Sequence, residues 1–108
     1  MNDTKLDNLI EILASGFQPG EAEGIEAVIN FHFSEEGGGE WVMTIHDQTC
    51  SIIAGKGANP RLVFSAKTQD CYDIFSGKLN GMAAYMQGKM ILEGDTGFAM
   101  KLARMFKL

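Results

Sequence analysis

The chain has 108 residues, and we expect a single domain over residues 1–108. Its net charge of −5 argues against nucleic acid as a partner, because phosphate binding needs a basic surface. No apolar run is as long as a membrane-spanning helix, and the acidic N-terminus MNDTKLDNL does not resemble a secretory signal. Two cysteines without a CxxC spacing, Cys50 and Cys71, fit reduced thiols in a cytoplasmic protein.

The first predicted element is a helix over residues 4–15. Thr4 and Asp7 resemble a capping box at its start, and Gly16 ends it. Its buried stripe consists of Leu6, Leu9, Ile10 and Leu13. Ile12 lies off this stripe and gives the helix a second apolar direction, and residues 17–24 are expected to form a loop.

Alternation of apolar and polar residues predicts five strands. They cover residues 25–33, 40–46, 49–54, 61–65 and 89–93. The first three should form an antiparallel meander, with a hairpin loop at residues 35–39. The apolar positions share one face of the sheet and the other face is mostly polar. We therefore expect an α+β fold with the helices on one face of the sheet and solvent on the other.

Three further helices are predicted at residues 69–76, 81–87 and 96–106, with Thr68, Asn80 and Asp95 as N-caps. The stripe of the last helix consists of Phe98, Leu102, Met105 and Phe106.

The segment from Gly77 to Phe106 is unusually rich in methionine. It contains five of the seven methionines of the chain: Met82, Met86, Met90, Met100 and Met105. Methionine side chains adapt to irregular gaps and to surfaces that fit several ligands. The last helix is also more apolar than one packing contact requires. This segment is either ordinary core, or it is covered by a second chain or by a ligand.

Two stretches resemble a known family. FSGKLNGMAAYMQGKMILEGD, Phe75–Asp95, combines a Gly-Lys-Leu step, a short helix with an aromatic residue, a Gly-Lys strand entry and a Gly-Asp helix start. ANPRLVFSAKTQDCYDIF, Ala58–Phe75, resembles the family's fourth strand and the helix after it. On these residues the chain resembles the sterol carrier protein type-2 domain, a lipid-binding module, from Leu6 to Leu108.

The resemblance implies a five-stranded mixed sheet in the order 3-2-1-4-5, helices on one face, and an apolar tunnel between sheet and helices. It also implies non-catalytic binding and transfer or presentation of a long apolar lipid: fatty acyl, sterol-like, phospholipid or isoprenoid. The alternative is an accessory protein that presents a quinone or isoprenoid intermediate to a biosynthetic enzyme complex. The residues expected to line the tunnel are Ile12, Phe31, Met43, Phe64, Phe75, Met82, Met86, Met90, Phe98, Leu102, Met105 and Phe106.

We expect no catalytic residues, no cofactor and no metal site. His32 and His46 fall on the solvent face, and a metal would need a third converging ligand. Asp70 and Asp73 fit helix-dipole complementarity and the helix surface better than acid–base chemistry. The sequence suggests no Ser–His–acid triad, neither cysteine has an evident base, and EEGGG lacks the pattern of a phosphate-binding loop.

The last helix is a candidate surface for partners besides the lipid. Lys101, Arg104 and Lys107 either complement its dipole or meet anionic head groups during transient contact with a membrane surface. The chain ends in Phe-Lys-Leu, whose bulky first residue departs from the peroxisomal signal, so we do not expect peroxisomal import.

The solvent face of the sheet is a second candidate surface. It is predicted to carry one apolar residue on each strand: Val28, Val42, Ile53, Val63 and Ile91. If they align, they form a ridge suited to a weak homodimer or to docking of an enzyme complex. The simpler interpretation is that β-branched residues suit strands.

Overall fold

The computed structural model describes residues 4–34 and 39–106. Predictions for the hairpin loop at residues 35–38, for residues 107–108, and for the side chains of residues 4–8 lie outside the described part.

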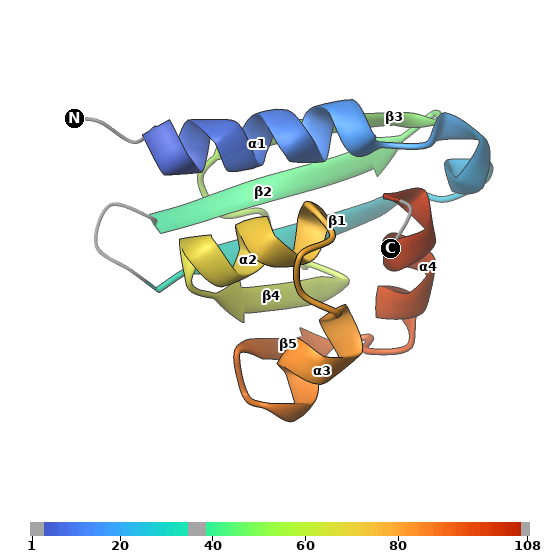
Figure 1. Cartoon of the computed structure of the whole chain (residues 1–108). Helices are drawn as coiled ribbons and strands as arrows, with labels where there is room; N and C mark the ends of the chain where they lie inside the picture. The colour runs from blue at the N-terminus through green and yellow to red at the C-terminus, as the bar shows by residue number, and fades with distance from the viewer. Residues whose placement is uncertain (1–3, 35–38, 107–108) are drawn as a thin grey trace.

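The described residues form five strands, four α-helices and one short 3-10 helix (Figure 1). In chain order they are α1 Thr4–Gly16, η1 Pro19–Ala22, β1 Ala27–Phe33, β2 Gly39–His46, β3 Thr49–Ala54, β4 Leu62–Ala66, α2 Thr68–Phe75, α3 Gly81–Met86, β5 Met90–Gly94 and α4 Phe98–Met105. The predicted elements agree with these to within two residues at each end. The predicted loop after α1 contains η1, which the prediction missed. Pro19 begins this helix, where proline is favoured because the first residues of a helix need no N–H donor.

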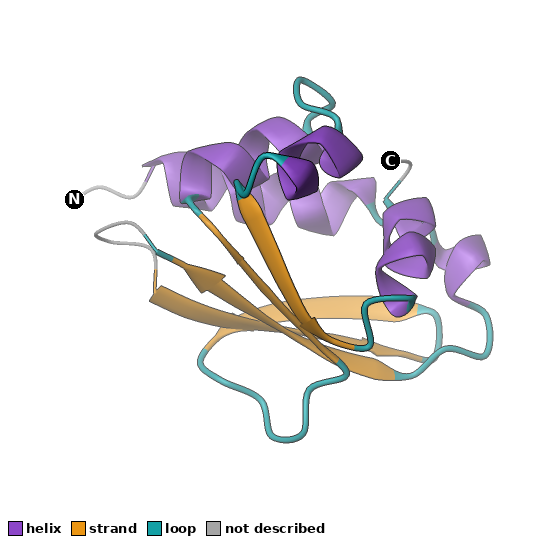
Figure 2. Ribbon diagram, turned by 90° about the horizontal axis from the view of Figure 1, so that it is seen from below, coloured by secondary structure: helices purple, strands orange, loops and turns teal. Residues whose placement is uncertain are grey.

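The strand order is β3-β2-β1-β4-β5, which confirms the predicted topology. Neighbouring strands are antiparallel except for β1 and β4, which are parallel, so the sheet is mixed. The helices lie on one side of the sheet, and the loop from β3 to β4 lies on the other (Figure 2). The predicted α+β class with helices on one face is therefore confirmed.

The helix-facing side of the sheet is the buried side. Ile29, Phe31 and Phe33 alternate along β1 and are almost wholly enclosed, as are Met43 and Ile45 on β2. Full burial of one such side chain stabilises a fold by about 1.5–3 kcal/mol. The period of two in the sequence thus identifies the face that receives the helices.

The alternation predicts that the opposite face of the sheet is exposed to solvent. In the structure, part of this face is covered. Asn30 is only 2% exposed because the loop after β3 crosses over it. Its side-chain amide donates to the carbonyl oxygen of Gly57 at 3.1 Å and accepts from the Gly57 N–H at 3.0 Å. Gly57 fits closely here: a Cβ on it would lie 2.8 Å from both Val28 and Val42.

The five apolar residues considered as a ridge on this face do not align, which agrees with the simpler interpretation of them. The register places Ile53 beside Val42, Val42 beside Asn30, and Asn30 beside Val63, so a polar residue interrupts the row. The row then reaches Glu93 rather than Ile91, because Val63 pairs with Glu93. With Gly57 packed over Val28 and Val42, this face offers no continuous apolar ridge for a homodimer.

The predicted helix cap holds for α3, but the predictions for α2 and α4 are wrong, because the residue before α4 is Gly97, without a side-chain cap bond. The Asn80 side chain accepts a hydrogen bond from the Ala83 N–H, and the Asp95 side chain accepts one from the Phe98 N–H at 3.1 Å. The N-cap of α2 is Lys67, without a side-chain cap bond. Thr68 is instead a buried residue inside the first turn.

Asp95 joins the start of α4 to β4. Its Oδ2 accepts a hydrogen bond from Arg61 Nε at 3.0 Å, and the Arg61 guanidinium lies 4.1 Å from the centre of the Phe98 ring. The hydrogen bond from Arg61, and then that from the Phe98 N–H, hold the pKa of Asp95 below its ordinary value of 3.8.

A charge-removing substitution tests this contact. Because the folded pKa is depressed, the stabilisation is present above the unfolded pKa and is lost as the pH falls through the folded pKa. We expect Asp95→Asn, which keeps a capping oxygen, to lower the urea midpoint at pH 7. The difference from wild type should shrink below pH 3.8. Glu93→Gln, an exposed control on the neighbouring strand, should show little difference at either pH. A deficit for Asp95→Asn that stays constant with pH would contradict the assignment.

Candidate functional site

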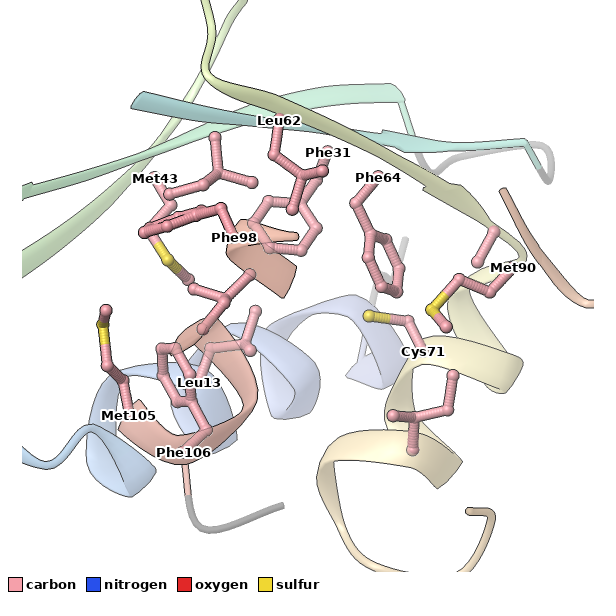
Figure 3. Close-up of a cluster of buried hydrophobic side chains, with 14 of the residues drawn as sticks. Leu13, Phe31, Met43, Leu62, Phe64, Cys71, Met90, Phe98, Met105 and Phe106 are labelled. Carbon is pink, nitrogen blue, oxygen red and sulfur yellow. The ribbon is translucent and has the colours of Figure 1, made fainter. Parts of the chain in front are cut away.

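An apolar layer fills the space between the sheet and the helices. We call it the interior layer: the buried apolar side chains of β1, β2, β4 and β5 on one side and of α1, α2, α3 and α4 on the other. In Figure 3 the side chains of the sheet and those of the helices point toward one another.

Most of the predicted lining residues belong to this layer. Buried within it are Phe31, Met43, Phe64, Met90, Phe98, Leu102, Met105 and Phe106. Phe75 is partly buried and packs against it. These residues come from four strands, from α2 and from α4 with the residue after it, so the topology brings distant parts of the sequence together. Whether they contact a ligand stays a prediction.

Three predicted lining residues lie outside the layer. Ile12 is only partly buried, because Leu9 and Leu13 form the inward face of α1. Met82 and Met86 are 60% and 78% exposed. Helix α3 is short and faces inward through Ala84, so its methionines point to solvent.

A chain of aromatic rings runs through the layer. Phe31 on β1 lies 5.2 Å from Phe64 on β4, measured between ring centroids, and Phe64 lies 6.2 Å from Phe75 on α2. Phe75 meets Phe106 edge-to-face at 5.5 Å, and Phe106 lies 5.7 Å from Phe17. Aromatic pairs at these distances attract one another beyond their burial. The rings therefore connect the sheet to the end of α4.

The sequence-based lining set omitted several residues that the layer contains. They are Leu9, Leu13, Ile29, Leu62, Cys71 and Ile74. The periodicity of each element marks these positions as buried. It does not separate residues that face the middle of the layer from residues that pack at its edge.

The interior layer carries no buried charge in the part of the chain that the structure describes. The buried polar residues there are Asn30, on the opposite face of the sheet, and Thr68, in the first turn of α2. A molecule held in this layer must therefore be apolar over its enclosed length. A polar head group would have to remain at the edge.

The tunnel implied by the resemblance stays a prediction. Two hollows in the described chain lie on the opposite face of the sheet. The first is lined by Glu26, Thr44, His46, Asn59 and Arg61 among others, and the second by residues that include Asn30, His32, Lys56 and Pro60. In the interior layer the side chains pack against one another, so an enclosed ligand would have to displace some of them.

A polar cluster at the end of β2 was not foreseen from the sequence. His46 Nδ1 lies 3.3 Å from a carboxylate oxygen of Glu26, and His46 Nε2 lies 2.9 Å from one of Asp47. These three residues can bring ligand atoms close enough for a metal ion. All of them are well exposed, and the contacts of His46 with the two carboxylates give the cluster its arrangement.

The two thiols are poor nucleophiles. Burial raises the pKa of Cys50 to about 11, and it raises the pKa of the fully buried Cys71 further. Both cysteines are free. Burial therefore disfavours the thiolate form of both side chains.

Alkylation should distinguish the two thiols. In the native protein we expect iodoacetamide to modify partly exposed Cys50 with a rate that rises about tenfold per pH unit below pH 11. Cys71 should react only after unfolding in urea, because the core encloses it. Peptide mapping by mass spectrometry measures both. Rapid native labelling of Cys71 would show that the core opens under mild conditions.

No helix among the described residues combines the length and apolar character needed to cross a bilayer.

Known proteins with similar sequences are larger than this chain. "Hydroxysteroid dehydrogenase-like protein 2" of Bos taurus is 33% identical over 81 residues, which cover 74% of this chain and 19% of that protein. "Peroxisomal multifunctional enzyme A" of Dictyostelium discoideum is 31% identical over 68 residues, 62% of this chain and 15% of that protein. The chain thus spans about a fifth of the length of the curated relatives it matches.

Solved structures with this fold include whole proteins of similar size. Sterol Carrier Protein 2 Like 2 from Aedes aegypti has a TM-score of 0.71 at 23% identity, over 93% of this chain and 94% of that one. Sterol Carrier Protein-2 from Aedes aegypti, in complex with C16 fatty acid (palmitate), has a TM-score of 0.69 at 18% identity, over 94% and 93%. The sec-alkylsulfatase Pisa1 from Pseudomonas has a TM-score of 0.78 at 22% identity, but the match covers only 16% of that chain.

The sequence pattern of one family covers nearly the whole chain. It is described as the SCP-2 sterol transfer family, and it matches residues 8–107. The strand order and the helices on one face are those expected from the resemblance of the sequence. The chain therefore belongs to the SCP-2 sterol transfer family.

Proposed function

We propose that this protein binds a long apolar lipid between its sheet and its helices and transfers or presents it without catalysing a reaction. The single observation that carries the proposal is the interior layer: a large apolar region, free of buried charge in the described chain, inside a fold of the SCP-2 family. The proposed lining residues are Phe31, Met43, Phe64, Phe75, Met90, Phe98, Leu102, Met105 and Phe106.

The composition of the layer supports a ligand that displaces side chains. Met43, Met90 and Met105 lie in it, and methionine repacks at lower cost than a branched residue. Phe98, Leu102 and Met105 belong to one short helix, α4. A small outward movement of α4 would open the layer without breaking the sheet. Reduced thiols at Cys50 and Cys71 fit a cytoplasmic location.

A fatty acyl chain is the simplest ligand to evaluate. A related structure contains a C16 fatty acid. Burial of about 16 methylene-sized groups gives on the order of 12 kcal/mol, at about 0.8 kcal/mol each. Association and ordering of the chain oppose this by at least about 4 kcal/mol. The remainder is at most about 8 kcal/mol, so a micromolar Kd is the tightest that this estimate allows.

The test has two parts. Lipid extracted from the purified protein should be detected by mass spectrometry, and native mass spectrometry should show it as added mass on the intact chain. Titration with a fluorescent C16 fatty acid should then give saturable 1:1 binding in the micromolar range. Binding that is not saturable below roughly millimolar concentration would overturn the proposal.

The size of the relatives favours the second candidate, presentation of a lipid to an enzyme. This chain matches 19% of a protein named as dehydrogenase-like and 16% of a sulfatase, so the fold occurs beside larger regions. Transfer of a fluorescent fatty acid between vesicles by the protein alone would favour simple transfer. Tight binding without transfer would favour presentation to an enzyme, including one that handles a quinone or isoprenoid intermediate.

A further inference from the structure

Helix α3 turns its small residues inward and its large apolar residues outward. Ala84 is fully buried, whereas Met82, Tyr85 and Met86 are 60%, 47% and 78% exposed. A helix that only fills the core shows the opposite arrangement, because large apolar side chains gain most from burial. Three large, exposed apolar side chains on one short helix therefore indicate an interaction surface.

The segment that carries α3, between Asp73 and Glu93, is basic, although the chain has a net charge of −5. Residues 74–92 contain no Asp or Glu, and their charged residues are Lys78 before α3 and Lys89 after it. Lys67 lies near Lys89, because the register pairs Ala66 with Met90 and the two lysines are the adjoining residues. All three lysines are exposed.

These groups lie at the edge of the molecule. Helix α3 packs against β5, which is an edge strand of the sheet, and Figure 1 shows both away from α1. The Lys89 N–H donates to the Ala84 carbonyl oxygen at 2.9 Å, which fixes this lysine at the end of α3. Ala84 belongs to the interior layer, so the same short helix has one side on the layer and the other on solvent.

We propose that this surface, which we call the α3 face (Met82, Tyr85 and Met86 with Lys67, Lys78 and Lys89), docks onto an anionic lipid bilayer. The methionines and the tyrosine enter the boundary between head groups and acyl chains, where an aromatic ring with a polar tip is favoured. The lysines bind the anionic head groups. The proposal rests on the proposed function, since docking brings the interior layer next to the membrane that supplies or receives the lipid.

Charge selects the bilayer over a second copy of this chain. In a symmetric dimer through the α3 face, the lysines of both copies would lie in one contact, and like charges repel. Outside the α3 face the chain has six Lys and Arg against 14 Asp and Glu, so most of its remaining surface is repelled by an anionic membrane. This fixes the orientation in which α3 meets the lipid.

Vesicle co-sedimentation tests the proposal. We expect the wild type to bind vesicles of phosphatidylcholine and phosphatidylglycerol at least about tenfold more tightly than vesicles of phosphatidylcholine alone, and to dissociate as salt is raised. Met82→Gln with Met86→Gln should weaken binding about tenfold or more. Lys78→Gln with Lys89→Gln should remove the preference for the anionic vesicles. The matched control Ile53→Gln changes a side chain that is 62% exposed on β3, the opposite edge strand, and should bind as wild type.

Each outcome is decisive. Absence of wild-type binding to anionic vesicles, or an equal loss in Ile53→Gln, would overturn the proposal. So would conversion of a wild-type dimer to a monomer by the α3 substitutions, which would make the α3 face a self-association surface.

Fatty-acid titration without vesicles separates the two proposals. The methionine double variant should keep the wild-type Kd, and a loss of that affinity would place Met82 and Met86 in the ligand site instead. A wild type that binds vesicles but no fatty acid would overturn the proposed function alone.

Discussion

Met105→Glu should abolish fatty-acid binding and destabilise the folded chain by several kcal/mol. Met105 is fully enclosed in the interior layer, and the described residues around it include no buried cation that could pair with a carboxylate. An unpaired buried charge costs on the order of 3–5 kcal/mol. The whole stability of a domain is about 5–15 kcal/mol, so this substitution removes a large share of it at pH 7.

The pH dependence of Met105→Glu identifies the cause. A buried carboxyl has a folded pKa above its unfolded value of about 4.3. The variant is therefore closest to wild type below that unfolded value, and its deficit grows as the pH rises through the folded pKa. Urea denaturation at pH 4 and pH 7, each compared with wild type at the same pH, measures this difference.

Two further variants separate binding from folding. Met100→Glu makes the same change on the same helix, but Met100 is 62% exposed, so stability should change by about 0.5 kcal/mol or less and binding should persist. Met105→Gln adds no charge and should remain folded, with fatty-acid affinity about tenfold weaker. A folded Met105→Glu or Met105→Gln that binds fatty acid as wild type does would show that the ligand site lies outside the interior layer.

The fold was predictable because its signals are local. Alternation along residues 27–33 identifies β1 and its buried face without knowledge of any other strand. The stripe of Phe98, Leu102 and Met105 does the same for α4. The order of the strands is not contained in such patterns, and it came from the resemblance to a family.

The predictions that failed depend on contacts between distant residues. Asn30 was placed in solvent by its position on the strand, but its partner Gly57 lies 27 residues further along the chain. The same loop covers Val42, which is buried by a segment with no periodicity of its own. A strand pattern states which side of the sheet a residue is on, and it does not state what covers that side.

Helix α3 shows why the residues of the interior layer were only partly predictable. A helix of 6 residues makes fewer than two turns, so its apolar residues do not define a face. Met82 and Met86 were expected in the lining because methionine adapts to surfaces that fit several ligands. The structure buries Ala84 instead, and this inversion is what distinguishes a surface helix from a core helix here.

The second large effect concerns the junction between β5 and α4. We expect Gly94→Ala to destabilise the protein by about 2–6 kcal/mol, from backbone strain of about 1–3 kcal/mol and overpacking of about 1–3 kcal/mol. Gly94 has a φ of +97°, and a Cβ on it would lie 2.7 Å from the carbonyl oxygen of Arg61. That oxygen is fixed, because it accepts the Asp95 N–H at 2.9 Å while the Arg61 N–H donates to Val28.

Gly88→Ala is the matched control for this junction. Gly88 also has a positive φ, +77°, but a Cβ on it would meet no atom within 4 Å. It should therefore show the backbone strain alone, and the urea midpoint of Gly94→Ala should be the lower of the two. The extra loss measures how tightly Arg61 holds the start of α4, the helix that we propose moves when lipid enters. Equal midpoints would mean that the backbone at Arg61, just before β4, shifts to make room for the added Cβ. The junction would then be less rigid than its hydrogen bonds indicate.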